Sequence, residues 1–227
     1  MPRELNKDDV RRNPLAVWVA KTIQWIRDHQ GVAGGVLAAI LVVAGGAGAY
    51  LWYQERQERA AQRIVARAHT ALWGETQGAA RNPDEAKKLY AGIAETYPGT
   101  VAAEESLIRL GNLQFDGQEY DQAIATFGTY LSTYARGRFR VMAGIGKAYA
   151  EEAKGDLPAA ERTLTELLKT VKDDPLEGEA HSSLAHIYEV MKKPDDAMRV
   201  YGQIADRFAQ SRWAQNALQR MSLLKSK

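Results

Sequence analysis

The feature that most constrains this chain of 227 residues is an internal repeat with a period of 37 residues. In each repeat an alanine is followed by bulky apolar residues after four, seven and eleven positions. These offsets lie on one face of an α-helix, so the pattern predicts four equivalent amphipathic helices. The small alanine lets a neighbouring helix approach closely while the bulky residues fill the space beside it. The alanines are Ala86, Ala123, Ala160 and Ala197, and the first bulky residues after them are Tyr90, Phe127, Leu164 and Tyr201.

A helix-start signal comes just before each of the four alanines. Proline or acidic residues, which are favoured in the first turn of a helix, occur in the segments 82–84, 118–121, 155–158 and 193–195. The residues ahead of these turns are expected to form the first helix of each pair, and residues 211–224 a capping helix. No alternation typical of strands competes. The predicted fold is therefore all-α, a solenoid of about four helix pairs in which each pair is buried on its neighbour.

The repeat resembles the tetratricopeptide repeat family. Two units carry the small-and-large signature of that family, and two keep one half of it, in Trp73-Gly74 and in Ala160 with Leu164. The resemblance implies a curved solenoid that binds proteins on a concave face formed by the first helices. The signature residues are Leu110, Gly111, Tyr120, Ala123 and Phe127 in one unit and Leu184, Ala185, Tyr188, Ala197 and Tyr201 in another.

The candidates for partner contact lie beside the packing positions of the first helices in the second and fourth pairs. Tetratricopeptide domains that clamp a carboxylate-ended peptide combine lysine and asparagine on this face. Asn112 fits that role, but no matching set of lysines accompanies it. The alternative for every candidate is an ordinary solvated surface. The candidates are Ile108, Asn112, Phe115, His186 and Glu189.

The second constraining feature is an uncharged stretch near the N-terminus. Residues 31–53 contain no charged side chain, and as a helix they would span roughly 34 Å, enough for a hydrocarbon core of about 30 Å. Tyr50, Trp52 and Tyr53 cluster at one end, where aromatic rings favour the headgroup layer. The stretch predicts a single transmembrane helix. A signal peptide cleaved near residues 47–49 is the alternative, and the long polar region before the stretch favours an uncleaved anchor.

The flanks of this stretch predict the remaining organisation. Residues 1–30 are expected to be a cytoplasmic tail with a short amphipathic helix, which lies on the membrane surface or binds a partner helix. Residues 1–28 carry six Lys and Arg against four just after the apolar stretch, so the positive-inside rule favours a cytoplasmic N-terminus. Residues 54–227 would then form a periplasmic repeat domain of a bacterial inner-membrane protein. Within the stretch, Gly31, Gly35 and Ala39 share one helix face and could pack closely on another helix, although small residues are common in such helices.

The layout of tail, anchor and degenerate repeats resembles the YfgM-type ancillary subunits of the SecYEG translocon. The resemblance implies a membrane-anchored interaction module that assists protein export or envelope biogenesis, with translocon subunits, exported chains or chaperones as partners. A scaffold or assembly factor for another membrane complex is the alternative. The oligomeric state is left open.

Composition excludes several other classes. The chain has no cysteine, which excludes disulfides, thiolate catalysis, cysteine-ligated metals and a lipoprotein anchor. Its net charge of +2 does not favour nucleic acid as the main partner. His181 and His186 are five residues apart, which does not place them on one helix face. No enzyme activity, metal, cofactor or small-molecule substrate is therefore expected. The one basic run, residues 136–140, is interpreted as a helix-start surface, with contact to anionic lipid or RNA as the alternative.

Overall fold

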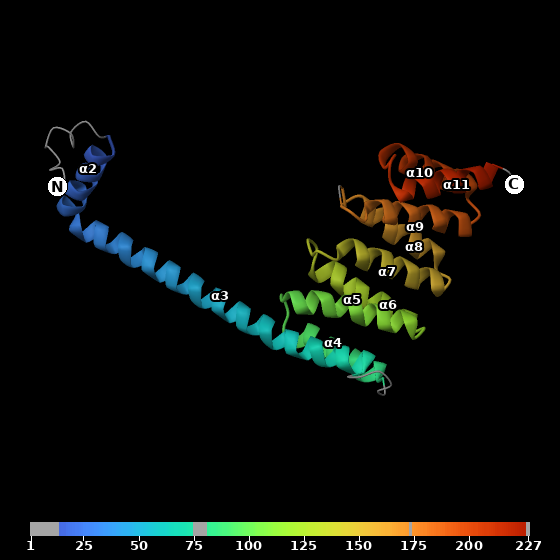
Figure 1. Ribbon diagram of the computed structural model, residues 1–227, viewed down its shortest axis with the longest axis horizontal. Helices are drawn as coiled ribbons and strands as arrows, with labels where there is room; N and C mark the ends of the chain where they lie inside the picture. The colour runs from blue at the N-terminus through green and yellow to red at the C-terminus, as the bar shows by residue number, and fades with distance from the viewer. Residues whose placement is uncertain (1–13, 75–80, 173, 226–227) are drawn as a thin grey trace, which may run out of the picture. The chain divides into compact units, whose positions relative to one another are not determined.

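The protein is all-helical in the part of the chain that a computed structural model describes, residues 14–74, 81–172 and 174–225. These residues form ten α-helices, α2 to α11, and no strand (Figure 1). Their contacts divide the chain into two units, one that ends at Glu55 and one that begins at Arg56. The helix α3 (Gln30–Trp73) contributes to both units, which are described separately.

The N-terminal unit consists of α2 (Pro14–Asp28) and the first part of α3. Apolar side chains of both helices are exposed, including those of Trp18, Leu41 and Val43. The 44 residues of α3 correspond to about 66 Å at 1.5 Å per residue. By length and composition α3 can cross a membrane, and a signal sequence near the N-terminus meets the same two criteria.

The second unit is the predicted solenoid of four helix pairs and a capping helix. The last part of α3 is the first helix of the first pair, and each later pair follows along the chain (Figure 1). The helix that completes the first pair is α4 (Pro83–Thr96). The next two pairs are α5 (Val101–Asp116) with α6 (Tyr120–Thr133), and α7 (Arg140–Ala153) with α8 (Leu157–Leu168). The last pair is α9 (Glu177–Val190) with α10 (Pro194–Arg207), and α11 (Arg212–Lys225) is the cap.

Local hydrogen bonds explain where several of these helices begin. The side chain of Asn82 accepts a hydrogen bond from the backbone N–H of Glu85 at 3.0 Å, and that of Asp156 from Ala159 at 3.0 Å. Such N-caps each contribute about 1 kcal/mol. Glu58 of α3 accepts from the backbone N–H of Val101 at 2.7 Å, which fastens the start of α5 to α3. A carboxylate there is also favoured by the helix dipole.

The core of the solenoid confirms the packing that the 37-residue period predicts. The four repeated alanines are fully buried, and the bulky residues four and seven positions after them are at most 5% exposed. The ring of Phe127 on α6 lies against two glycines, Gly111 of α5 and Gly146 of α7. One aromatic side chain of a second helix is therefore wedged between the first helices of its own pair and of the next. The predicted cap is also confirmed, because Trp213, Ala217 and Met221 pack on the last pair.

The helices of this unit form two layers. First helices touch the next first helix along the stack, α5 with α7 and α7 with α9. Among the described residues no such contact joins α4 to α6, α6 to α8 or α8 to α10. The first helices are thus more closely spaced than the second helices. In a curved stack the more closely spaced layer lies on the inner side, so the first helices form the inner layer.

The wedge at Phe127 predicts opposite effects for two glycine substitutions within helices. A Cβ at Gly111 would lie 2.6 Å from Cε1 of Phe127, whereas a Cβ at Gly128 would meet nothing within 4 Å. We expect Gly111→Ala to lower the free energy of unfolding by about 1–2 kcal/mol through overpacking. We expect Gly128→Ala to raise it by about 0.5–1 kcal/mol because alanine favours the helix.

Urea unfolding of the full chain in detergent, followed by circular dichroism, measures both changes. Equal shifts in the same direction for Gly111→Ala and Gly128→Ala would show that the contact with Phe127 does not limit packing.

Candidate protein-interaction surfaces

The inner layer exposes one side chain at the same position of three successive first helices. Asn112 on α5, Tyr149 on α7 and His186 on α9 are separated by 37 residues each, and all three are exposed. We call these residues the inner row. Asn112 and His186 were predicted as contact residues from the sequence, whereas Tyr149 was missed. The 37-residue period applied to either neighbour would have found it.

Polar contacts tie two members of the inner row, Tyr149 and His186, to an adjacent helix. The hydroxyls of Tyr149 and Ser183 lie 3.0 Å apart, and Nε2 of His186 lies 2.9 Å from Oε1 of Glu152. Each contact joins α7 to α9, so the spacing of the two helices is held at the surface as well as in the core. Side chains positioned in this way are held in fixed conformations at the surface.

The other predicted contact residues lie deeper in the fold. Ile108 is 6% exposed and belongs to a buried apolar cluster with Phe127 and Tyr130. Phe115 is half-buried, and its ring centroid lies 5.7 Å from that of Tyr120 at the start of α6. Ile108 and Phe115 therefore pack in the interior of the second pair, where a partner protein would not contact Ile108 directly.

Glu189 belongs to a network that fastens the capping helix. Its Oε1 accepts hydrogen bonds from the Tyr201 hydroxyl at 2.6 Å and from Nε of Arg220 at 3.0 Å. Burial by itself raises the pKa of Glu189, but the hydrogen bonds from Arg220 and Tyr201 lower it below its usual value. Burial and the contact with Glu189 raise the pKa of Tyr201 to about 12. The carboxylate therefore stays ionised and links α9, α10 and α11.

The glycines predicted to pack on another helix lie open in the N-terminal unit. A Cβ built at Gly31 or at Gly35 would meet nothing within 4 Å, and Ala39 is exposed. This face of α3 is available to a second helix. Its use by such a helix stays a prediction.

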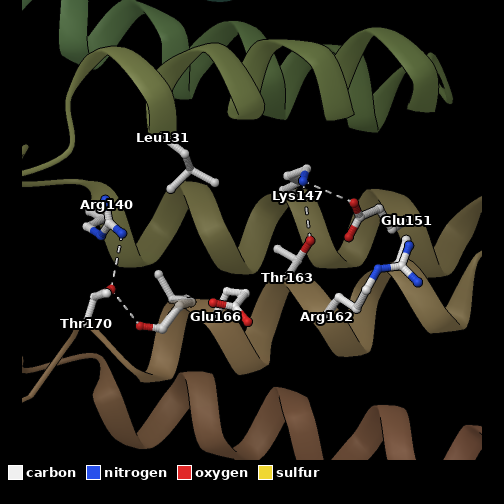
Figure 2. Close-up of a pocket in the computed structure, with 10 residues that line it drawn as sticks. Leu131, Arg140, Lys147, Glu151, Arg162, Thr163, Glu166 and Thr170 are labelled. Atoms are coloured by element: carbon white, nitrogen blue, oxygen red, sulfur yellow. Dashed lines mark hydrogen bonds and ion pairs between the residues drawn. The ribbon is translucent and has the colours of Figure 1, made fainter.

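On the outer side, the wide spacing of the second helices leaves grooves that are floored by the first helices. One groove lies between α6 and α8 over α7 and has a volume of about 520 Å³ (Figure 2). A smaller groove of about 290 Å³ lies between α4 and α6 over α5. We call them the α6–α8 groove and the α4–α6 groove. The two occupy the same place in successive repeats, because several lining residues of one are 37 positions from lining residues of the other.

The α6–α8 groove is lined by charged residues, and apart from Arg140 in the basic run no sequence motif had singled them out. Arg140 and Lys147 come from α7 and Arg162 from α8, and Figure 2 shows Arg140 and Arg162 at opposite ends of the groove. Nζ of Lys147 lies 3.3 Å from Oε1 of Glu151 and 3.4 Å from Oγ1 of Thr163. The basic run at 136–140 thus has two roles. It ends at the start of α7, and its last residue, Arg140, lines the groove.

A buried ionic cluster lies at the start of α9. Glu177 is 1% exposed and makes two contacts with Arg207, at 2.7 and 2.9 Å. Nε2 of His181 lies 3.8 Å from Oε1 of Glu177, and the imidazole ring packs on Phe208. Burial lowers the pKa of His181, and it outweighs the opposing effect of the Glu177 carboxylate. His181 is therefore held neutral among its neighbours.

None of these clusters has the composition of a metal site. In the described ranges no group of three or more His, Cys, Asp and Glu residues could hold a metal ion. The arrangement offers exposed polar side chains, charged grooves and an apolar helix, which are means of binding other macromolecules.

Comparison with known proteins bears on the fold. Residues 105–136, which cover most of the second helix pair, match the family model of the tetratricopeptide repeat. No curated protein matches the sequence significantly.

Solved structures of similar architecture include a MamA protein, at 17% identity over 76% of this chain and 82% of that one, with a TM-score of 0.55. A tetratricopeptide repeat protein from Parabacteroides merdae aligns over 74% and 61% of the two chains at 14% identity, with a TM-score of 0.56. Repeats of a putative kinesin light chain from Podosopora anserina align over 76% and 85% at 14% identity, with a TM-score of 0.52. Identities this low show the fold alone.

The second unit is thus a tetratricopeptide-like solenoid. Domains of this kind are typically protein-interaction modules without enzymatic activity.

The environment of His181 predicts an acid-sensitive repeat domain. The unfolded chain binds a proton on this histidine near pH 6.5, whereas the folded chain binds it only at lower pH. The stabilisation is therefore complete above pH 6.5 and is lost as the pH falls toward the lowered pKa. We expect His181→Gln to flatten the decline in melting temperature between pH 7.5 and 5.5.

Melting curves of the full chain in detergent at pH 7.5, 6.5 and 5.5 measure this effect. His69→Gln, at an exposed histidine of α3 for which the described residues form no ion pair, serves as the control and should keep the decline of the parent protein. An unchanged decline in His181→Gln would assign the acid sensitivity to other groups.

Proposed function

We propose that this protein is a membrane-anchored interaction module whose repeat domain lies outside the cytoplasm and assists protein export near the translocon. The observation that carries the proposal is the inner row, a set of exposed side chains repeated on successive first helices, in a chain that also has an apolar helix long enough to span a bilayer. A tetratricopeptide-like solenoid offers an extended surface for weak contacts with a protein chain. An anchor raises the local concentration of that surface at the membrane.

Charge in the flanks of α3 supports the orientation. Lys and Arg are more numerous in residues 1–28 than in the turns after the apolar stretch, which favours retention of the N-terminus in the cytoplasm. The repeat domain would then face the space into which exported chains emerge.

Orientation can be tested because the chain contains no cysteine. Gln215→Cys places a single thiol on α11, where Gln215 is exposed. We expect a membrane-impermeant maleimide to label it in intact cells after selective permeabilisation of the outer membrane. Asn6→Cys in the N-terminal tail is the control and should react only after lysis. The reverse pattern would place the repeat domain in the cytoplasm and overturn the proposed role in export.

The partner-binding role can be tested by photo-crosslinking in cells. A benzoylphenylalanine residue replaces Tyr149 in the inner row or, as the control, the exposed Gln203 on α10 in the outer layer. We expect adducts with a translocon subunit or an exported chain at position 149, because the inner row would lie in the interface. Adducts of equal yield at both positions, or none at 149, would contradict the proposal.

A second candidate function, a scaffold for another membrane complex, is favoured by the open face around Gly35. In a scaffold, α3 itself would pack on a partner helix through its small residues. Gly35→Leu in the crosslinking strain separates the two candidates. An unchanged adduct at position 149 would support the export module. Loss of the adduct in protein that still inserts into the membrane would assign partner binding to α3.

A further inference from the structure

We propose that the α6–α8 groove binds an extended acidic segment of a partner protein. The inference rests on the proposed function, because it takes the ligand to be a protein. It adds the chemistry of the segment that this groove recognises. The groove lies in the outer layer and is distinct from the inner row.

The groove holds two guanidinium groups that no carboxylate of the described residues neutralises. Arg140 donates to the backbone oxygen of Ala135 at 2.8 Å and to Oγ1 of Thr170 at 3.1 Å, and both acceptors are neutral. Its Nε is buried and has no partner in the described part of the chain. The exposed Arg162 makes no ion pair or hydrogen bond with any described residue. An anionic ligand would supply acceptors for the accessible guanidinium hydrogens that these contacts leave unused.

Comparison with the neighbouring pairs shows that a lysine at position 147 is specific to the third pair. Lys147 stands where the neighbouring pairs have Leu110 and Leu184, so a cation replaces an apolar side chain on the floor of the groove. Packing alone explains leucine at this position, but it does not explain lysine.

Arg162 also differs from its counterparts. In the α4–α6 groove the same position is Ala125. In the fourth pair it is Arg199, which lies 3.1 Å from the carboxylate of Asp196. The residue that corresponds to Asp196 in the third pair is Ala159, so Arg162 lacks the acidic neighbour that neutralises Arg199. The third pair therefore has the arginine but not the aspartate that pairs with it in the fourth pair.

A buried carboxylate in the same groove favours a peptide over a free anion. Glu151 is 5% exposed, and its Oε1 lies 3.3 Å from Nζ of Lys147. Its Oε2 is buried and has no hydrogen-bond partner among the described residues. The negative charge of Glu151 repels a free phosphate, whereas the neutral backbone of an extended chain is not repelled. The other acidic lining residue, Glu166, is neutralised by Lys169 at 2.5 Å.

The length of the groove sets the spacing of the acidic residues. Figure 2 shows Arg162 at the same end of the groove as Glu151, and from Arg140 to Glu151 the rise along α7 is about 16 Å. At roughly 3.3 Å per residue, an extended segment covers this distance in about five residues. The ligand is therefore a segment with two Asp or Glu residues about five positions apart, whose carboxylates reach Arg140 and Arg162.

Fluorescence anisotropy with the full chain in detergent micelles tests the proposal. The probe is a labelled nine-residue peptide of Ser, Ala and Gly with two Glu residues five positions apart, and its control has Gln at both positions. We expect the Glu peptide to bind at least about tenfold more tightly, with Arg140→Gln and Arg162→Gln each weakening it by about tenfold. Arg199→Gln, at the matched position of the fourth pair, should leave binding unchanged.

Two outcomes overturn the proposal. The first is equal binding of the Glu and Gln peptides, or of the parent protein and the Arg140→Gln and Arg162→Gln variants. The second is displacement of the peptide by inorganic phosphate far beyond that by sodium chloride at the same ionic strength, which would make the groove an anion site. Unchanged melting curves verify that the variants fold. The peptide assay needs no membrane partner. It can therefore fail while crosslinking at position 149 succeeds, and crosslinking can fail while the peptide still binds.

Discussion

The repeat domain depends on contacts in which a large side chain of one helix meets a glycine of another. The ring of Phe127 is so close to Gly111 and Gly146 that a methyl group on either would collide with it. Leu167 makes the same kind of contact with Gly144. Because protein interiors are close-packed, the sizes of these residues determine how closely the helices approach. The alanines and bulky apolar residues that recur every 37 residues make each pair stack on the previous one in a similar way.

This packing produces two surfaces with different chemistry. The first helices touch one another and carry the inner row, while the second helices are spread apart and leave grooves over the first helices. Charges that serve the fold are paired, as Glu177 is with Arg207. Arg140 and Arg162 have no such carboxylate among the described residues. That difference separates charges that stabilise the fold from charges that are available to a ligand.

The helix α3 serves each of the two units in a different way. Its first part is apolar and exposed, which is costly in water and favourable in a bilayer. Its last part buries Ala61 and Ala68 against α4 and α5, and Glu58 fastens the start of α5. An interaction module joined to an anchor in this way, as we propose for this protein, requires no separate docking domain to reach the membrane.

The sequence by itself determined the helices, their pairing, the cap and the apolar segment, because periodicity and helix-start residues are local properties. It also identified Asn112 and His186 as surface residues, although it missed Tyr149. It could not show that Ile108 is buried, because burial depends on which helix packs on which. The α6–α8 groove was decided by the tertiary structure alone. Its arginines are 22 residues apart in the chain, and only the stacking of α7 on α8 brings them to the two ends of one groove.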